Sequence, residues 1–327
     1  MANPTYRACV VAPFGRDFIS AADLGAVGRH IAGRDPTLLW KPVPVSDSSR
    51  PLIHFRAPTL ATMLVQFHGF RYPPLPDCDG PRLECHPLHK ATQLAMLEEA
   101  GLPVPPWAIL TRDTEIDAAA FGDHLIVKPT EFGASLGQGV QLIRTDRFET
   151  YRDRHAPAYE APGRSPPIVQ KFIRTGANAL HFRAITFMGR VVHSAALENV
   201  APIPFDRLAS RLALSEAVAS NAGERRGWLF EDAEIFALAG RVASVFDSPV
   251  IGIDFLRSED TGELFVLEAN MGNVWLFSSK LGRAARRRLG IDAIRQQHDV
   301  FAVVADAIVE RARRELPAQG GPGGPSS

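Results

Sequence analysis

The sequence is poor in the features that would place a chain outside the cell or in a membrane. Only three of its 327 residues are cysteines, Cys9, Cys78 and Cys85, and so small and odd a number fits free thiols in a reducing cytoplasm. No apolar run approaches the roughly 18 residues that a membrane-spanning helix needs. The N-terminal residues lack the basic start and apolar stretch of a secretory signal. We therefore expect a cytoplasmic protein without a membrane partner.

The sequence also lacks an excess of either charge. Lys plus Arg and Asp plus Glu both number 36, so the formal net charge is zero. Such a balance provides no overall field to attract nucleic acid or an anionic membrane. The basic run at 283–288 falls in a predicted helix, where we interpret it as a solvated face. We expect no nucleic-acid partner, and the sequence leaves a homo-oligomer open.

The pattern of apolar residues predicts an α/β fold with α+β lobes and much antiparallel sheet. A polar, proline-containing loop near residue 80 and another at 155–167 suggest boundaries between lobes. The predicted divisions are a small N-terminal α/β lobe at 1–88, a middle lobe at 89–166, a C-terminal lobe at 167–316 and a disordered tail at 317–327.

A hairpin centred on Thr261 carries two acidic residues within otherwise apolar strands. A three-residue turn that ends on Gly262 at positive φ fits the sequence there. Residues equally far from Thr261 then face each other, and Asp254 and Glu268 are both seven positions away. Asn270 lies on the same face because side chains alternate along a strand. The spacing therefore predicts that two carboxylates and an amide share one face.

Two bare carboxylates about 5 Å apart repel each other by about 3 kcal/mol at an effective dielectric near 20. A divalent cation with oxygen ligands removes this penalty, and Mg²⁺ typically binds one or two carboxylates together with substrate phosphates. The alternative is a solvated hairpin face with unconnected acids, which a one-residue slip in register would also produce.

A lysine at the end of an apolar strand precedes a glycine-rich segment. Lys128 ends the run LIVK, and GASLGQG follows at 133–139. Glycines let backbone N–H groups approach phosphate closely. The spacing matches neither the dinucleotide-binding fingerprint nor the P-loop. A flexible hairpin loop is the alternative, and the nearby carboxylates favour a phosphate site.

The order of these motifs resembles the ATP-grasp superfamily, most closely the branch of ribosomal-protein glutamate ligases and glutathione synthetase. The resemblance covers roughly residues 88–282 and runs through these segments in order: Lys90 before a helix ending in GLPVP, then VKP, GASLGQGV, VQKFI, HFR, GIDFL and EAN. It implies a fold in which two α+β lobes hold ATP, preceded by a small α/β lobe.

The resemblance also implies the roles of individual residues. Lys90 and Lys128 contact the ATP phosphates, Ser135 and Gly137 belong to the loop over them, and Arg183 faces the transferred phosphoryl group and the carboxylate substrate. The hinge strand that reads adenine is Gln170, Lys171, Phe172 and Ile173. Asp254, Glu268 and Asn270 hold two Mg²⁺ ions, for which Mn²⁺ can substitute. The catalytic residues are Arg183 and Lys128.

Three details depart from the family or extend beyond it. His181 stands where many relatives have an acid two residues before the arginine, which puts the contacts to an amine substrate in doubt. Lys171 replaces a common glutamate of the hinge strand. The apolar run with Asn273 and Trp275 is interpreted as part of the substrate pocket, with core packing as the alternative.

These features predict a ligase that uses ATP and Mg²⁺ to join a carboxylate to an amine through an acyl phosphate. The expected substrates are small amino-acid-like molecules or a peptide end. Intramolecular ring closure, a small-molecule kinase and a nucleotide-binding regulator without turnover are the alternatives. Four residues, Cys78, Cys85, His86 and His89, raise the question of zinc, but their spacing matches no common finger.

Overall fold

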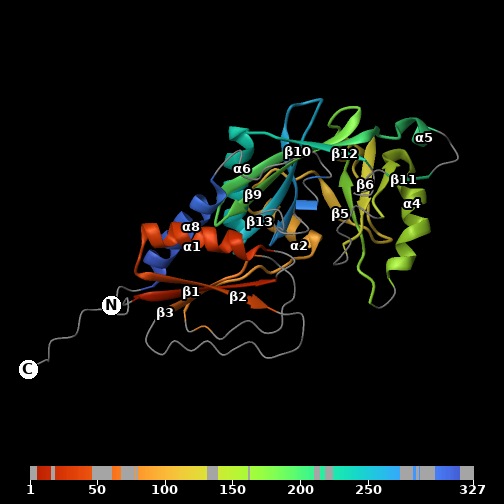
Figure 1. The fold of residues 1–327 in the computed structure, drawn as a ribbon. Coiled ribbons are helices and arrows are strands. Elements are labelled where there is room, and N and C mark those ends of the chain that lie inside the picture. The colour runs from red at the N-terminus through yellow and green to blue at the C-terminus, as the bar shows by residue number, and fades with distance from the viewer. Residues whose placement is uncertain are drawn as a thin grey trace, which may run out of the picture.

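The computed structural model describes three β-sheets with helices packed between and around them (Figure 1). The described residues are 6–15, 19–45, 61–67, 78, 80–130, 139–160, 163–209, 214–217, 224–272, 283, 284, 287 and 299–316. Within these ranges no helix is both long and apolar enough to cross a membrane. The tail predicted at 317–327 lies outside them.

The first sheet is parallel and has the strand order β2-β1-β3-β4. Its strands are β1 (Ala8–Gly15), β2 (Leu38–Val45), β3 (Ala61–Val65) and β4 (Arg82–Leu83). Helix α1 (Ala21–Arg34) crosses from β1 to β2 and begins at Ser20, whose hydroxyl accepts a hydrogen bond from the backbone N–H of Ala22 at 3.2 Å. Its buried residues pack on the sheet, as the predicted amphipathic pattern requires.

The second sheet is antiparallel, with the order β11-β7-β6-β8-β5. Its strands are β5 (Trp107–Ile109), β6 (His124–Lys128), β7 (Gln141–Arg144), β8 (Ile168–Lys171) and β11 (Glu216–Ala217). Around it lie α3 (Ala118–Phe121), α4 (Phe148–His155), α5 (Phe205–Ala209) and two 3-10 turns at Thr145–Arg147 and Ala156–Tyr159. Helix α2 (Lys90–Glu99) packs instead against the third sheet.

The lobe boundaries remain a prediction, and hydrogen bonds join the chain across the one proposed at residue 167. β8 and β11 both come after that residue, yet β8 pairs with β5 and β6, and β11 pairs with β7. Periodicity in a short apolar strand identifies the strand but does not say which neighbour it pairs with.

The third sheet is antiparallel and has the order β12-β10-β9-β13-β14. Its strands are β9 (Asn178–Phe187), β10 (Arg190–Pro202), β12 (Arg225–Leu229), β13 (Val250–Arg257) and β14 (Leu264–Met271). A two-residue turn joins β9 to β10, with Met188 and Gly189 both at positive φ. Helices α6 (Ala233–Val245) and α8 (Val300–Glu315) pack against this sheet.

Helices α1 and α8 lie side by side between the first and third sheets (Figure 1). Their buried side chains belong to one continuous apolar cluster with those of β1, β9 and β13. The second sheet has smaller clusters of its own, one of them under α4. The first and third sheets therefore share a core that leaves one face of the third sheet for polar residues.

The hairpin of β13 and β14 has the predicted pairing at its acidic residues, but the pairing nearer the turn differs from the prediction. Asp254 pairs with Glu268, as expected, and Gly262 has a φ of 72°. Nearer the turn, however, Phe255 pairs with Val266, so the register there differs by one residue from the predicted one. A β-bulge after Val266 adds the missing residue. Without this bulge Glu268 would lie on the opposite face from Asp254.

Candidate functional site

Asp254 lies between two other charged residues in neighbouring strands of the third sheet. It pairs with Glu268 of β14 on one side and with Arg183 of β9 on the other. Arg183 donates from Nε to Oδ1 and from Nη2 to Oδ2 of Asp254, both at 2.6 Å, in a bidentate ion pair. The Asp254 side chain is only 4% exposed. We call the face that carries these three side chains the site face.

Glu268 is held by groups on two elements. Its Oε2 lies 3.7 Å from Nζ of Lys90, the first residue of α2, and its Oε1 accepts a hydrogen bond from Nδ2 of Asn270 at 3.0 Å. The side chain of Gln93 fixes α2 to β14, because its Oε1 accepts a hydrogen bond from the backbone N–H of Ala269 at 3.2 Å. The two carboxylates are therefore each matched with a different cation.

Lys128 reaches this cluster from the second sheet. Its Nζ donates to Oε1 of Gln170, on the neighbouring strand β8, at 2.6 Å. Burial lowers the pKa of Lys128 to about 7, while the negative charge of Glu268 opposes this shift. The charges of Glu268, Lys90 and Asp254 all act on Lys128, and we interpret the end of β6 as facing the site face. A lysine that loses solvation beside a neutral amide is well suited to an added anion.

The predicted hinge strand is anchored in the second sheet. Gln170 is 1% exposed, and its Nε2 has no hydrogen-bond partner among the described residues. The backbone N–H groups of Lys171 and Phe172 donate to Pro106 and His124 carbonyls, at 2.8 and 3.0 Å. The Phe172 ring packs edge-on against other rings, and Ile173 is buried. A buried amide N–H without a partner fits a ligand acceptor beside Lys128.

The donors on the site face fit Mg²⁺, which prefers carboxylate and neutral oxygen ligands. Asp254, Glu268 and Asn270 supply such oxygens, and the cations around them fit phosphate. No group of three or more His, Cys, Asp and Glu side chains gathers in the part of the chain that the structure describes. A cation bound by Asp254, Glu268 and Asn270 would need further oxygen ligands to complete its shell.

The loop predicted to cover the phosphates lies only partly in the described residues. Ser135 and Gly137 fall outside them, as do Asn273 and Trp275 of the predicted substrate pocket. Gly139 closes the loop with a φ of 76°, and a Cβ there would lie 3.0 Å from Cγ of Pro129. The chain thus requires glycine at this end of the loop.

Two residues beside Arg183 extend the site face toward β12. Burial and the positive charges of Arg183 and Arg225 hold the pKa of His181 well below its usual value, so the ring is neutral at neutral pH. Sequence reasoning missed Arg225 because β12 belongs to no family motif. The sequence does contain two adjacent arginines, Arg225 and Arg226, and in a strand one of them must lie on each face. This pattern could have indicated an arginine on the site face.

The two cysteines considered for zinc donate hydrogen bonds to backbone carbonyls. The Cys85 thiol is buried and donates to the backbone carbonyl of Gln66 at 3.5 Å, and that of Cys78 donates to Gly80 at 3.7 Å. Burial raises the pKa of Cys85 to about 11, and burial has the same effect on Cys9. The thiols of Cys9 and Cys85 are therefore protonated at neutral pH.

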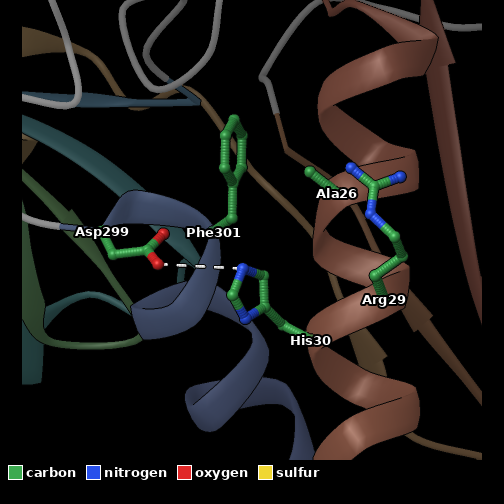
Figure 2. Close-up of a pocket in the computed structure, with 5 residues that line it drawn as sticks. All are labelled: Ala26, Arg29, His30, Asp299 and Phe301. Carbon is green, nitrogen blue, oxygen red and sulfur yellow. Dashed lines mark ion pairs between the residues drawn. The ribbon is translucent and has the colours of Figure 1, made fainter.

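The described pockets lie apart from the site face. One of about 320 Å³ opens between α1 and the start of α8, where His30 and Asp299 lie 3.8 Å apart beside Arg29 and Phe301 (Figure 2). His30 and Asp299 are 34% and 60% exposed, so this is a solvated surface pair. A second pocket of about 970 Å³ is lined by residues of α3 and α4, the start of β6 and the end of β7. Neither contains a predicted site residue.

Comparison with known proteins identifies the fold. No protein-family model matches the sequence, and no curated protein does. Among solved structures, the ATP-grasp ligase PsnB complexed with a phosphomimetic variant of its minimal precursor, Mg and ADP aligns with a TM-score of 0.54. The sequences are 16% identical over 94% of this chain and 100% of that one. The D-cycloserine synthetase DcsG gives a TM-score of 0.51 and 17% identity over 93% and 99%.

At such low identities these similarities establish the fold alone. The chain has the ATP-grasp fold, as the resemblance of its motifs predicted.

Proposed function

We propose that this chain is a ligase that uses ATP and Mg²⁺ to join a carboxylate to an amine. The observation that carries the proposal is the pairing of Asp254 with Glu268 on a face bordered by Lys90, Lys128 and Arg183. Similar structures support it, because PsnB was captured with Mg and ADP, and DcsG is a synthetase. The substrates we propose are small amino-acid-like molecules or a peptide end.

The residues present can perform the two half-reactions that such a ligase needs. Asp254, Glu268 and Asn270 would hold two Mg²⁺ ions, which would neutralise phosphate charge when bound. Lys90 and Lys128 would bind the phosphates, and Gln170, Lys171, Phe172 and Ile173 would border the adenine. Ser135 and Gly137 belong to the loop that would exclude water.

Arg183 would orient the substrate carboxylate for in-line attack on the γ-phosphorus of ATP. The attacking carboxylate oxygen forms a new P–O bond while the bond to the ADP oxygen breaks, which gives ADP and an acyl phosphate. The amine then attacks the acyl carbon, phosphate leaves, and the amine loses a proton. Asn273 and Trp275 remain our proposed substrate-pocket residues.

Two alternatives share the same fold and site. Ring closure within one amino-acid derivative is favoured by the similarity to DcsG, and a small-molecule kinase would stop after phosphoryl transfer. Nucleotide binding without turnover is disfavoured because each described ATP or metal position carries a chemically competent side chain. The products distinguish these cases.

The test is phosphate release from ATP in the presence of pools of amino acids and small acids, followed by mass spectrometry of the active pools. A ligase gives ADP, phosphate and an amide, with loss of activity in Glu268→Gln. A stable phosphorylated product would indicate a kinase instead. No ADP with any pool would contradict the proposal.

A further inference from the structure

A row of nitrogen-bearing side chains continues the site face beyond Arg183. Strand pairing places Ala195 opposite Arg183, Leu197 opposite His181, and Asn199 opposite Arg225. Because side chains alternate along each strand, Arg183, His181 and Arg225 all lie on the face that carries Asp254. The row runs from β9 across β10 to the edge strand β12, away from Glu268 on the opposite edge strand β14.

The Arg225 side chain crosses β10 and lies against the ring of His181. Its Nη2 is 3.4 Å from Nδ1 and 3.3 Å from Nε2 of that ring. Nearly equal distances to both ring nitrogens place the guanidinium over the ring face rather than in line with one lone pair. Arginine stacks in this way on aromatic rings while its N–H edge stays directed outward. The ring thus fixes where the Arg225 N–H groups point.

The local charge favours an anion and disfavours a cation. Burial beside the guanidinium groups of Arg183 and Arg225 keeps the ring of His181 neutral. An ammonium group beside Arg225 would meet the positive charge of that guanidinium, whereas the charge of Arg183 is offset by its ion pair with Asp254. A carboxylate there can accept two parallel hydrogen bonds from one guanidinium.

We propose that Arg225, held against His181, binds a carboxylate of a substrate other than the carboxylate that becomes activated. The group can come from two sources, a dicarboxylic donor or the free carboxylate of an amino-acid acceptor, which share the same chemistry. This inference rests on the proposed function and narrows its substrate class to molecules with such an additional carboxylate. Arg183 remains with the reacting carboxylate, and Arg225 sets specificity.

The kinetic test compares Arg225→Gln with Arg226→Gln, its neighbour in sequence. Arg226 lies on the opposite face, exposed and paired with Glu198, so it is a matched control. Arg225→Gln should raise KM for the substrate with the additional carboxylate by about 10- to 100-fold, with little change in kcat or in KM for ATP. If KM rises for the dicarboxylic donor, the additional carboxylate belongs to the donor. If KM rises for the amino-acid acceptor, it belongs to the acceptor.

A substrate analogue with a primary amide in place of that carboxylate should bind the wild type more weakly. Its KM should not change further in Arg225→Gln. Equal losses for the acid and the amide would indicate a structural role and contradict the inference, as would an unchanged KM. Arg225→Lys should recover part of the affinity, because the charge remains and the fork of N–H groups is lost.

A binding assay separates failure of this inference from failure of the proposed function. Thermal melting with Mg²⁺ and ADP reports the nucleotide site, and added succinate, glutarate or L-glutamate reports the carboxylate subsite. At least one of them should raise the Tm of the wild type and of Arg226→Gln but not of Arg225→Gln. If none stabilises the wild type, the subsite is wrong. Stabilisation that depends on Arg225, without turnover in any pool, would contradict only the ligase.

Discussion

Arg183 has a structural partner as well as a proposed catalytic role. The sequence suggested that its charge is offered to phosphate, but its guanidinium makes two hydrogen bonds with the nearly buried Asp254. A cation bound by Asp254, or a substrate bound by Arg183, must therefore compete with or add to this ion pair. This pairing also explains how two facing carboxylates coexist, since Arg183 offsets one of them and Lys90 the other.

Arg183→Ala should therefore lower stability as well as abolish turnover. Removal of the guanidinium leaves Asp254 with an unmatched charge, at a cost of about 2–4 kcal/mol, reduced from that of a fully buried pair because Arg183 is 19% exposed. Urea unfolding measures the loss, and the double variant Arg183→Ala/Asp254→Ala should recover much of it. A single variant as stable as the wild type would show that the ion pair contributes nothing.

Lys128 should couple ATP binding to pH. Its pKa of about 7 in the unliganded chain lies below that of an unfolded lysine, so above pH 7 the folded state binds fewer protons than the unfolded state. Phosphate charge would raise this pKa again, so ATP binding should take up a proton near pH 8, and affinity should fall as pH rises from about 7 to 10.

Calorimetry of ATP binding in two buffers of different ionisation enthalpy measures this proton uptake directly. Lys128→Met serves as the control, because it has no titratable group at this position and should show equal heats in both buffers. Equal heats for the wild type at pH 8 would mean that Lys128 does not charge when ATP binds.

At the scale of elements, the position of Lys90 depends on how α2 is attached to β14. Gln93 accepts a hydrogen bond from the Ala269 N–H and donates from Nε2 to the Leu88 carbonyl at 2.8 Å. Gln93→Ala should lower the free energy of unfolding by about 1–3 kcal/mol, because a buried N–H loses its acceptor, and should raise KM for ATP. Thr92→Ala, on the exposed side of the same helix, is the control. Identical values for both variants would show that this attachment does not position Lys90.

The elements also show what could be predicted from the sequence. The sequence predicted a helix that begins near Lys90 and a hairpin centred on Thr261, and α2, β13 and β14 lie at these positions. The predicted pairing of Asp254 with Glu268 was correct. The prediction of one symmetric register for the whole hairpin was wrong, because a bulge shifts the register nearer the turn. A bulge depends on local twist and side-chain packing, which the alternation of residues does not encode.

Other parts of the site depended on contacts between distant segments. The pairing of Arg183 with Asp254 joins residues 71 positions apart, and the attachment of Gln93 to Ala269 spans 176. The edge strand β12 is short and arginine-rich, so neither apolar alternation nor a motif marked it. Arg225 was missed for this reason.

For the whole molecule, the proposed site connects the second and third sheets. Lys128 comes from one sheet, and Asp254, Glu268 and Asn270 come from the other. A nucleotide with Mg²⁺ bound between them would stabilise the folded chain against unfolding by mass action, by about 2.7 kcal/mol at a concentration 100 times Kd. The wild type should therefore melt at a higher temperature with ADP and Mg²⁺ together than with either alone.

Glu268→Gln tests this coupling. Because Glu268 is partly exposed and its ion pair with Lys90 is loose, the unliganded variant should keep its stability within about 1 kcal/mol. The Mg²⁺-dependent part of the ADP effect should shrink, and turnover should fall by orders of magnitude, because the cation loses a charged ligand. A magnesium titration of both melting and turnover gives the answer. Unchanged Mg²⁺ dependence would place the metal elsewhere.

The unequal burial of the three thiols makes the unmodified chain convenient for spectroscopy. Cys9 and Cys85 are buried, and their high pKa values keep them in the unreactive thiol form at neutral pH. Cys78 is partly exposed, so a maleimide dye should attach there first. A single fluorophore next to the first sheet would then follow nucleotide-dependent movement without any engineered cysteine.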